Sequence, residues 1–172
     1  MTQTIVQKKI CLLGDFSVGK TSLIRRFVDG RFDDKYLGTI GVKISRKTLL
    51  RPYGQMNLLV WDLAGSNGFD TPSEMAYLHG AAGALIVCDL TRQDTLAAFE
   101  RYAHLMRAIN PTACLVFIGN KMDLITERVI PDADLRDTCL PYHGDWFLTS
   151  ARTGERVENA FMHITGQLEA QK

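Results

Sequence analysis

Residues 10–23 read ICLLGDFSVGKTSL, an apolar run joined to a helical pattern through a loop that has Gly14 and Gly19 at its ends. The run 10–13 is typical of a strand buried on both faces of a parallel sheet. The spacing G-x-x-x-x-G-K-[ST] lets the backbone turn sharply and approach a ligand closely. We therefore expect a strand, a loop and a helix, with backbone N–H groups forming an anion cradle.

The same alternation of apolar runs and helical patterns continues along the chain. Further short apolar runs occur at 58–61, 84–88, 114–118 and 146–148. Apolar residues recur every three or four positions within 96–109 and 157–168, which predicts two amphipathic helices. Segments 42–50 and 56–61, joined by the turn 51–54, predict a hairpin that places one antiparallel strand beside the parallel set. The pattern predicts one α/β doubly wound domain, in which ligands bind at the carboxyl ends of the strands.

Length and composition predict a single domain over residues 1–172. Of the 172 residues, 46% are hydrophobic, enough to bury a core without disulfides or metals. The formal net charge of +1 argues against a protein that binds nucleic acid through bulk charge. The four cysteines show no CxxC or Cys/His spacing, so we expect buried thiols in a reducing compartment rather than disulfides or zinc.

Charge is unevenly distributed along the chain. Residues 1–51 contain 11 Lys and Arg against 4 Asp and Glu, a net charge of +7, and the remainder carries −6. Two interpretations are open for this basic third. It forms a surface for a partner or lipid, or it forms solvated faces of one helix and one strand that an anionic ligand partly balances.

No targeting or membrane-spanning signal is evident. The start lacks a charged-then-apolar pattern, and no apolar run approaches the roughly 20 residues that span a bilayer. Residues 167–172 contain no cysteine for prenylation. We expect a soluble, cytoplasmic protein, with peripheral membrane association only if a lipidated tail has been removed.

The loop 14–21 carries the side chains that a nucleotide's phosphates require. Lys20 would neutralise the β- and γ-phosphates, and the hydroxyl of Thr21 would bind a Mg²⁺ that keeps several waters. The alternative is a chance match to an eight-residue pattern, but its place between a strand and a helix argues against chance.

Two later loops indicate the base. NKMD at 120–123 follows an apolar run, and the Asp123 carboxylate can accept hydrogen bonds from the N1 and the exocyclic amine of guanine. Adenine offers neither in that arrangement and would leave a buried carboxylate unpaired. TSAR at 149–152 can direct a backbone N–H to the guanine O6. The sequence therefore predicts GTP and GDP, with Mg²⁺, as ligands.

With these loops in this order, the sequence resembles the Ras superfamily of small GTPases, most closely its Rab branch, over essentially the whole chain. The resemblance rests on GDFSVGKTSL at 14–23, YLGTIGV at 36–42, WDLAG at 61–65, NKMD at 120–123 and SARTG at 150–154. It implies a P-loop NTPase G domain with a mostly parallel six-stranded sheet, one antiparallel strand and helices on both faces. It also implies a GTP-dependent switch that hydrolyses GTP and is monomeric.

The resemblance assigns roles to individual residues. Thr39 closes over Mg²⁺ and the γ-phosphate, Asp62 holds Mg²⁺ through water, and the Gly65 N–H touches the γ-phosphate. Phe32 packs against guanine, unless it is a plain core aromatic, and Tyr36 covers the phosphates. The residues expected to contact the nucleotide are Ser17, Val18, Gly19, Lys20, Thr21, Ser22, Phe32, Tyr36, Thr39, Gly65, Asn120, Lys121, Asp123, Ser150, Ala151 and Arg152. Those expected to bind Mg²⁺ are Thr21, Thr39 and Asp62, and those at the reaction centre are Lys20, Thr39, Gly65 and Ser66.

Two positions depart from the family pattern. Ser66 stands where the family usually has a glutamine that orients the attacking water, and serine is too short to replace it directly. Phe16 stands where Ras has glycine and Rab proteins commonly have a small residue, so its ring is expected to project toward the γ-phosphate and obstruct an arginine finger. We expect intact binding and slow hydrolysis.

Three function classes are open at this point. The first is a GTP-dependent switch with weak hydrolase activity. The second is a GTP-loaded adaptor or pseudo-GTPase with negligible turnover, and the third is a P-loop kinase of small metabolites, which would not need NKMD. For the switch, effector and regulator proteins are expected at loops 32–42 and 62–78. A short helix is expected from Ser73, with Met75, Tyr77 and Leu78 either anchoring a partner or packing on the neighbouring helix.

Overall fold

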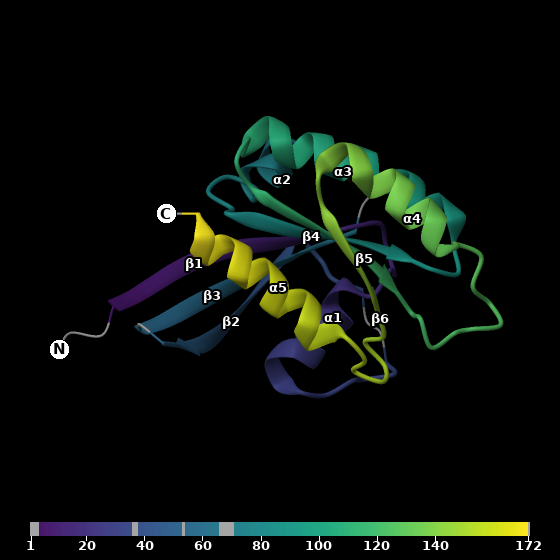
Figure 1. Ribbon diagram of the computed structural model, residues 1–172, viewed down its shortest axis with the longest axis horizontal. Helices are drawn as coiled ribbons and strands as arrows, with labels where there is room; N and C mark the ends of the chain where they lie inside the picture. Colours follow the sequence, from purple (N-terminus) through teal and green to yellow (C-terminus); the bar gives the residue numbers. More distant parts are fainter. Residues whose placement is uncertain (1–3, 36–37, 53, 66–70, 172) are drawn as a thin grey trace.

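The computed structural model describes residues 4–35, 38–52, 54–65 and 71–171, and shows a sheet between two layers of helices (Figure 1). The six strands lie in the order β2-β3-β1-β4-β5-β6. Their bounds are Thr4–Leu13 for β1, Val42–Arg51 for β2, Gly54–Leu63 for β3, Gly83–Asp89 for β4, Cys114–Asn120 for β5 and Asp145–Thr149 for β6. The β2–β3 pair is antiparallel and every other neighbouring pair is parallel. The predicted sheet is therefore confirmed.

The helices cover both faces of the sheet, as predicted. They are α1 at Lys20–Asp29, α2 at Pro72–Ala76, α3 at Gln93–Ile109, α4 at Asp132–Cys139 and α5 at Val157–Ala170, with a 3₁₀ turn at Leu140–Tyr142. Figure 1 shows α1 and α5 on one face, and α2, α3 and α4 on the other. Each layer has its own core.

The two cores explain why the central strands are continuously apolar. Along β4, Ile86 belongs to the core beneath α3, whereas Leu85 and Val87 belong to the core beneath α1 and α5. Each core contains an aromatic pair. Phe27 stacks on Phe161 with ring centroids 4.1 Å apart, and the rings of Phe99 and Phe117 meet under α3. Apolar and polar residues do not alternate along these strands, because both faces of the strands are buried.

Two elements differ from the sequence prediction. β1 begins at Thr4 rather than residue 10, because its first half pairs with β3 from Thr4↔Gly54 onward while its side chains stay largely exposed. An exposed strand gives no continuous apolar run. Helix α4 was missed because it buries only Leu135 and Cys139, too few for a recognisable stripe.

Candidate functional site

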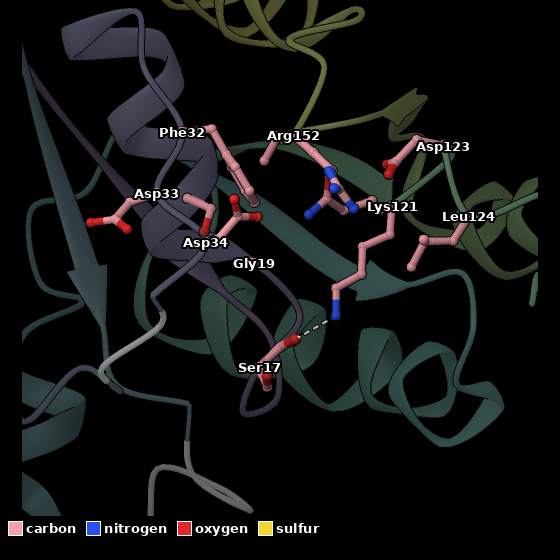
Figure 2. Close-up of a pocket in the computed structure, with 12 residues that line it drawn as sticks. Ser17, Gly19, Phe32, Asp33, Asp34, Lys121, Asp123, Leu124 and Arg152 are labelled. Carbon is pink, nitrogen blue, oxygen red and sulfur yellow. Dashed lines mark hydrogen bonds between the residues drawn. The ribbon is translucent and has the colours of Figure 1, made fainter.

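A cavity of about 200 Å³ opens at the carboxyl ends of the parallel strands, where the polar loops were predicted to meet. Figure 2 shows Phe32 and Asp34 on one side of it and Lys121 and Asp123 on the other. The residues that line it are Ser17, Gly19, Ser22, Phe32, Asp33, Asp34, Asn120, Lys121, Asp123, Leu124, Ala151 and Arg152. Nine of these twelve residues were predicted to contact the nucleotide; Asp33, Asp34 and Leu124 were not.

The loop between β1 and α1 approaches the NKMD loop closely. Gly19 has φ 104°, and a Cβ at this position would lie 2.3 Å from Asn120 Nδ2. That amide donates to the carbonyl oxygen of Val18 at 3.0 Å. Only glycine fits both the left-handed backbone and this contact. Helix α1 begins immediately afterwards, so its first N–H groups face the loop.

Lys20 is a buried cation at the start of α1. Its side chain is 6% exposed, and its ammonium donates to the carbonyl oxygens of Gly14 at 2.7 Å and Asp15 at 3.0 Å. Burial lowers the pKa of Lys20 to about 8, although Asp62 and Asp15 act in the opposite direction. The ammonium therefore lies in a place where its charge is incompletely compensated by the protein.

Thr21, Thr39 and Asp62 come together from three separate segments. The Thr21 hydroxyl is 2.7 Å from that of Thr39 and donates to Asp62 Oδ2 at 2.5 Å, while Thr39 donates to the same oxygen at 3.4 Å. Asp62 is 1% exposed, and its Oδ1 has no hydrogen-bond partner among the described residues. Burial raises the pKa of Asp62 more than these hydrogen bonds lower it.

This arrangement fits a divalent cation. Hydroxyl and carboxylate oxygens are the ligands that Mg²⁺ prefers, and Asp62 Oδ1 is a buried acceptor to which no described residue donates. The pKa shifts of Lys20 and Asp62 both disfavour the charged form, and each would be reversed by an opposite charge beside it. An anion near Lys20 and a cation near Asp62 would supply these two opposite charges.

The NKMD and TSAR loops, which line the cavity, are held together by hydrogen bonds between side chains and loops. Asn120 Oδ1 accepts from the hydroxyl of Thr149 at 3.0 Å and from the N–H of Ala151 at 3.2 Å, so one amide joins three loops. Asp123 Oδ1 accepts from the hydroxyl of Ser150 at 2.6 Å. The NKMD and TSAR loops are thus fixed against each other by contacts within the protein.

Lys121 extends this hydrogen-bond network to the loop between β1 and α1, residues 14–19. Its ammonium donates to the carbonyl oxygen of Ser17 at 3.0 Å, drawn as a dashed line in Figure 2, and to Asp89 Oδ2 at 2.6 Å. Burial alone would raise the pKa of Asp89, but hydrogen bonds from Lys121 and Thr91 outweigh it and lower the pKa. Asp89 was not predicted as a site residue. It ends β4 at the same edge of the sheet, so the rule that ligands bind at the carboxyl ends of parallel strands would have found it.

Three arginines and a tyrosine that sequence reasoning missed also support the site. Arg26 binds the TSAR loop from α1, and Arg92 donates to the carbonyl oxygen of Phe16 at 2.7 Å. Arg101 and Tyr102 of α3 donate to the carboxylate of Asp15 at 2.8 and 3.0 Å. No local pattern marks these side chains, because each acts on a loop distant in the sequence.

Two phenylalanines have different surroundings. Phe32 lines the cavity and also packs on the core beneath α1 and α5, so the core interpretation is partly right and contact with a base stays a prediction. Phe16 is 56% exposed, and its ring lies against Gly38: a Cβ built there would be 3.3 Å from Phe16 Cε2. The ring therefore covers the segment that leads into Thr39.

Gly65 lies at the phosphate loop, as expected for a residue whose N–H faces the γ-phosphate. A Cβ at Gly65 would be 2.6 Å from the backbone nitrogen of Phe16, so no larger residue fits without a shift. The predictions for Tyr36, Ser66 and the rest of 66–70 lie outside the described residues. Beyond them, α2 begins at Pro72 with Thr71 as its N-cap, one residue before the expected start.

The residues after α2 pack inward. Leu78 is fully buried in the core beneath α3, and Tyr77 packs against that core with its ring 6.2 Å from that of Trp61. For Leu78 the packing interpretation is confirmed. The four cysteines are free thiols; Cys11, Cys88 and Cys139 are buried, whereas Cys114 is only partly buried. Within the described parts of the chain, no helix is both long and apolar enough to cross a bilayer.

Comparison with known proteins agrees with the geometry. A sequence model described as "Ras family" matches residues 9–170. Human Rab-22A is 34% identical over 161 residues, which cover 93% of this chain and 82% of that protein. Rab-31 of Homo sapiens and RABD1 of Arabidopsis thaliana are each 33% identical, over 95% and 94% of this chain and 84% and 78% of their own lengths. The resemblance to the Rab branch is confirmed, and the chain belongs to the Ras family of small GTPases.

Proposed function

We propose that this chain is a guanine-nucleotide switch that binds GTP and GDP tightly and hydrolyses GTP slowly. Family membership implies the coarser part, a GTP-binding switch with GTPase chemistry. The slow rate is the finer part of the proposal. The observation that carries it is Phe16, whose exposed ring lies on the segment leading into Thr39 at the phosphate end of the site.

Each part of the nucleotide has a matching part of the site. The cradle N–H groups and Lys20 would bind the phosphates, and the carboxylate of Asp123 would bind the N1 and amine of guanine. Thr21, Thr39 and Asp62 would hold Mg²⁺, either directly or through water, and the ion would neutralise charge that develops on the phosphates. No covalent intermediate with the protein is needed.

The switch follows from the difference between GTP and GDP. Only GTP offers γ-phosphate oxygens to Thr39 and to the N–H of Gly65. When they are lost, both loops lose a contact and the surface at 32–42 and 62–78 changes. We propose that effector and regulator proteins bind there, that the protein is a cytoplasmic monomer, and that membrane association requires a lipidated tail.

Slow hydrolysis has two causes in this proposal. Ser66 is too short to orient the attacking water as the usual glutamine does, and Phe16 obstructs the entry of an arginine from an activating partner. Loss of a contact that orients the attacking water is expected to lower the rate of hydrolysis roughly ten- to hundredfold. A GTP-loaded adaptor without turnover is the alternative, and the same two residues motivate it. The third class, a metabolite kinase, is disfavoured by family membership and by the NKMD loop.

Single-turnover hydrolysis of preloaded GTP tests the proposal. Wild type is compared with Ser66→Gln and Phe16→Gly, with phosphate release and GDP followed together. We expect Ser66→Gln to accelerate the reaction about tenfold, and Phe16→Gly to change it less because no activating partner is present whose arginine the ring could obstruct. Turnover as fast as in ordinary small GTPases would contradict the proposal, and no turnover in any variant would favour the adaptor.

A further inference from the structure

Arg26 connects helix α1 to the loop that closes the base end of the cavity. Its Nε donates to the carbonyl oxygen of Ala151 at 2.9 Å and its Nη2 to that of Arg152 at 2.5 Å. Its stem lies against the same loop, since a Cβ at Gly154 would be 3.4 Å from Arg26 Cδ. Arg26 is half-buried and is not among the residues that line the cavity, unlike Ala151 and Arg152.

The hydrogen bond to the Ala151 carbonyl fixes the orientation of the 151–152 peptide, and the one to the Arg152 carbonyl holds the next peptide of the same loop. No cis peptide occurs among the described residues, and in a planar trans peptide the C=O and the following N–H point in opposite directions. Because the Ala151 carbonyl points to Arg26, the N–H of Arg152 points away from Arg26. Ala151 and Arg152 both line the cavity, whereas Arg26 does not.

The neighbouring donor is already engaged. The N–H of Ala151 donates to Asn120 Oδ1 at 3.2 Å, whereas the N–H of Arg152 has no acceptor among the described residues. A backbone donor in the cavity wall that faces away from Arg26 and has no acceptor among the described residues is suited to a ligand oxygen. The acceptor that a guanine base presents, on the edge next to N1, is its C6 oxygen.

We propose that Arg26 is a positioning residue for base recognition: it aims the Arg152 N–H at the C6 oxygen of guanine. The inference rests on the proposed function, because it requires a guanine nucleotide in this cavity. It assigns base selection to two independent groups. Asp123 recognises N1 and the 2-amino group, and the peptide held by Arg26 recognises the 6-position.

Two analogues separate these contacts. Inosine 5′-diphosphate lacks the 2-amino group and keeps the C6 oxygen. 6-Thioguanosine 5′-diphosphate keeps N1–H and the amine but replaces that oxygen with sulfur, a weaker acceptor. Affinities of wild type and Arg26→Ala for GDP and both analogues are measured with Mg²⁺. We expect Arg26→Ala to reduce the preference for GDP over the thio analogue about fivefold and to leave the preference over the inosine analogue unchanged.

Arg107 provides a matched control. Its Nη1 also donates to two backbone carbonyls, those of Pro111 at 3.0 Å and Ala113 at 2.7 Å, at the end of α3 and away from the cavity. Arg107→Ala should leave both preferences at the wild-type values. Arg26→Lys keeps one amine donor and should fall between wild type and Arg26→Ala.

Each outcome bears on the inference. An Arg26→Ala variant that keeps the wild-type preference over the thio analogue overturns it, and so does an equal loss of both preferences, which indicates general loosening. If Arg26→Ala does not fold, Arg26→Lys decides, and an unchanged preference overturns the inference. Failure of wild type to bind GDP instead overturns the proposed function.

Discussion

The base end and the phosphate end of the site differ in how their polar groups are satisfied. At the base end, Asn120, Lys121 and Asp123 all have partners within the protein. At the phosphate end, Lys20 and Asp62 are buried charges whose pKa values are shifted toward the neutral form. The base end is therefore held by contacts within the protein, whereas the buried charges at the phosphate end would be complemented by ligand charge.

The departures from the family pattern fall in the motifs that are expected to serve the phosphates. Phe16 lies within GDFSVGKT and Ser66 directly follows WDLAG in the sequence, whereas NKMD and SARTG at the base end are kept. Binding energy from the base and cradle does not depend on the residues that assist hydrolysis. A chain can therefore keep tight nucleotide binding while its rate of hydrolysis falls.

The largest effect is expected at Lys20. Lys20→Met removes the cation that would face the phosphates, and we expect GTP affinity to fall about 10³-fold because a charge-assisted contact in a buried site is lost. Isothermal titration with GTP and Mg²⁺ measures this. Lys8→Met, a lysine of β1 far from the cavity, serves as the control. Unchanged GTP affinity in Lys20→Met would show that the phosphates bind elsewhere.

Asp123 tests the base end. Asp123→Ala removes the acceptor for N1 and the amine, and we expect GDP affinity to fall about 100-fold, with the preference for GDP over the inosine analogue abolished. Competition binding with the two diphosphates checks both numbers. If the preference survives, another group recognises the amine and the assignment of Asp123 is wrong.

Two buried aspartates sharpen the comparison through stability. Asp89→Asn removes a carboxylate that has a lowered pKa and accepts from Lys121, so we expect a loss of about 2 kcal/mol in the free energy of unfolding at pH 7. A carboxylate whose pKa is lowered by folding stabilises the protein at pH values above its pKa in the unfolded chain, near 3.9. This stabilisation is lost as the pH falls through the pKa of the folded state. The difference between Asp89→Asn and wild type should therefore shrink in acid.

Asp62→Asn is the control of opposite sign. Its carboxyl has a raised pKa, so ionisation destabilises the nucleotide-free protein and the neutral amide should stabilise it by about 1 kcal/mol at pH 7. Denaturant melts without nucleotide measure both variants across pH. Destabilisation by both to the same extent would remove the proposed difference between the two ends.

The smallest effect is expected at Arg152. We propose that Arg152 contacts the nucleotide through its backbone N–H and not through its side chain. Arg152→Lys should therefore change GDP affinity by less than about twofold. A larger change would mean that the guanidinium itself contacts the nucleotide. Fluorescence displacement of a labelled GDP is sensitive enough for this comparison.

Much of the fold followed from local patterns. Strands covered on both faces and helices with a full apolar stripe were predictable, because burial leaves a periodic signal in the sequence. The first half of β1 and helix α4 were not, since one is exposed and the other buries only Leu135 and Cys139. Their positions are set by pairing and packing with segments far along the chain.

The site divides in the same way. Lys20, Thr21, Asn120 and Asp123 lie in motifs whose spacing carries the chemistry, and the structure brings them to one edge of the sheet. Supporting residues such as Arg26 could not be predicted, because their partners are backbone carbonyls more than a hundred residues away. Asp89 could have been found from its place at the end of a strand.

One measurement tests the central claim, that binding and hydrolysis are separated in this chain. The protein is loaded with GTP labelled at the γ-phosphate, freed of excess nucleotide, and followed with Mg²⁺ for bound label and released phosphate, beside human Rab-22A. We predict that the label stays bound while phosphate appears at least about tenfold more slowly than in Rab-22A. Rapid loss of intact GTP, or phosphate release at the Rab-22A rate, would contradict the account.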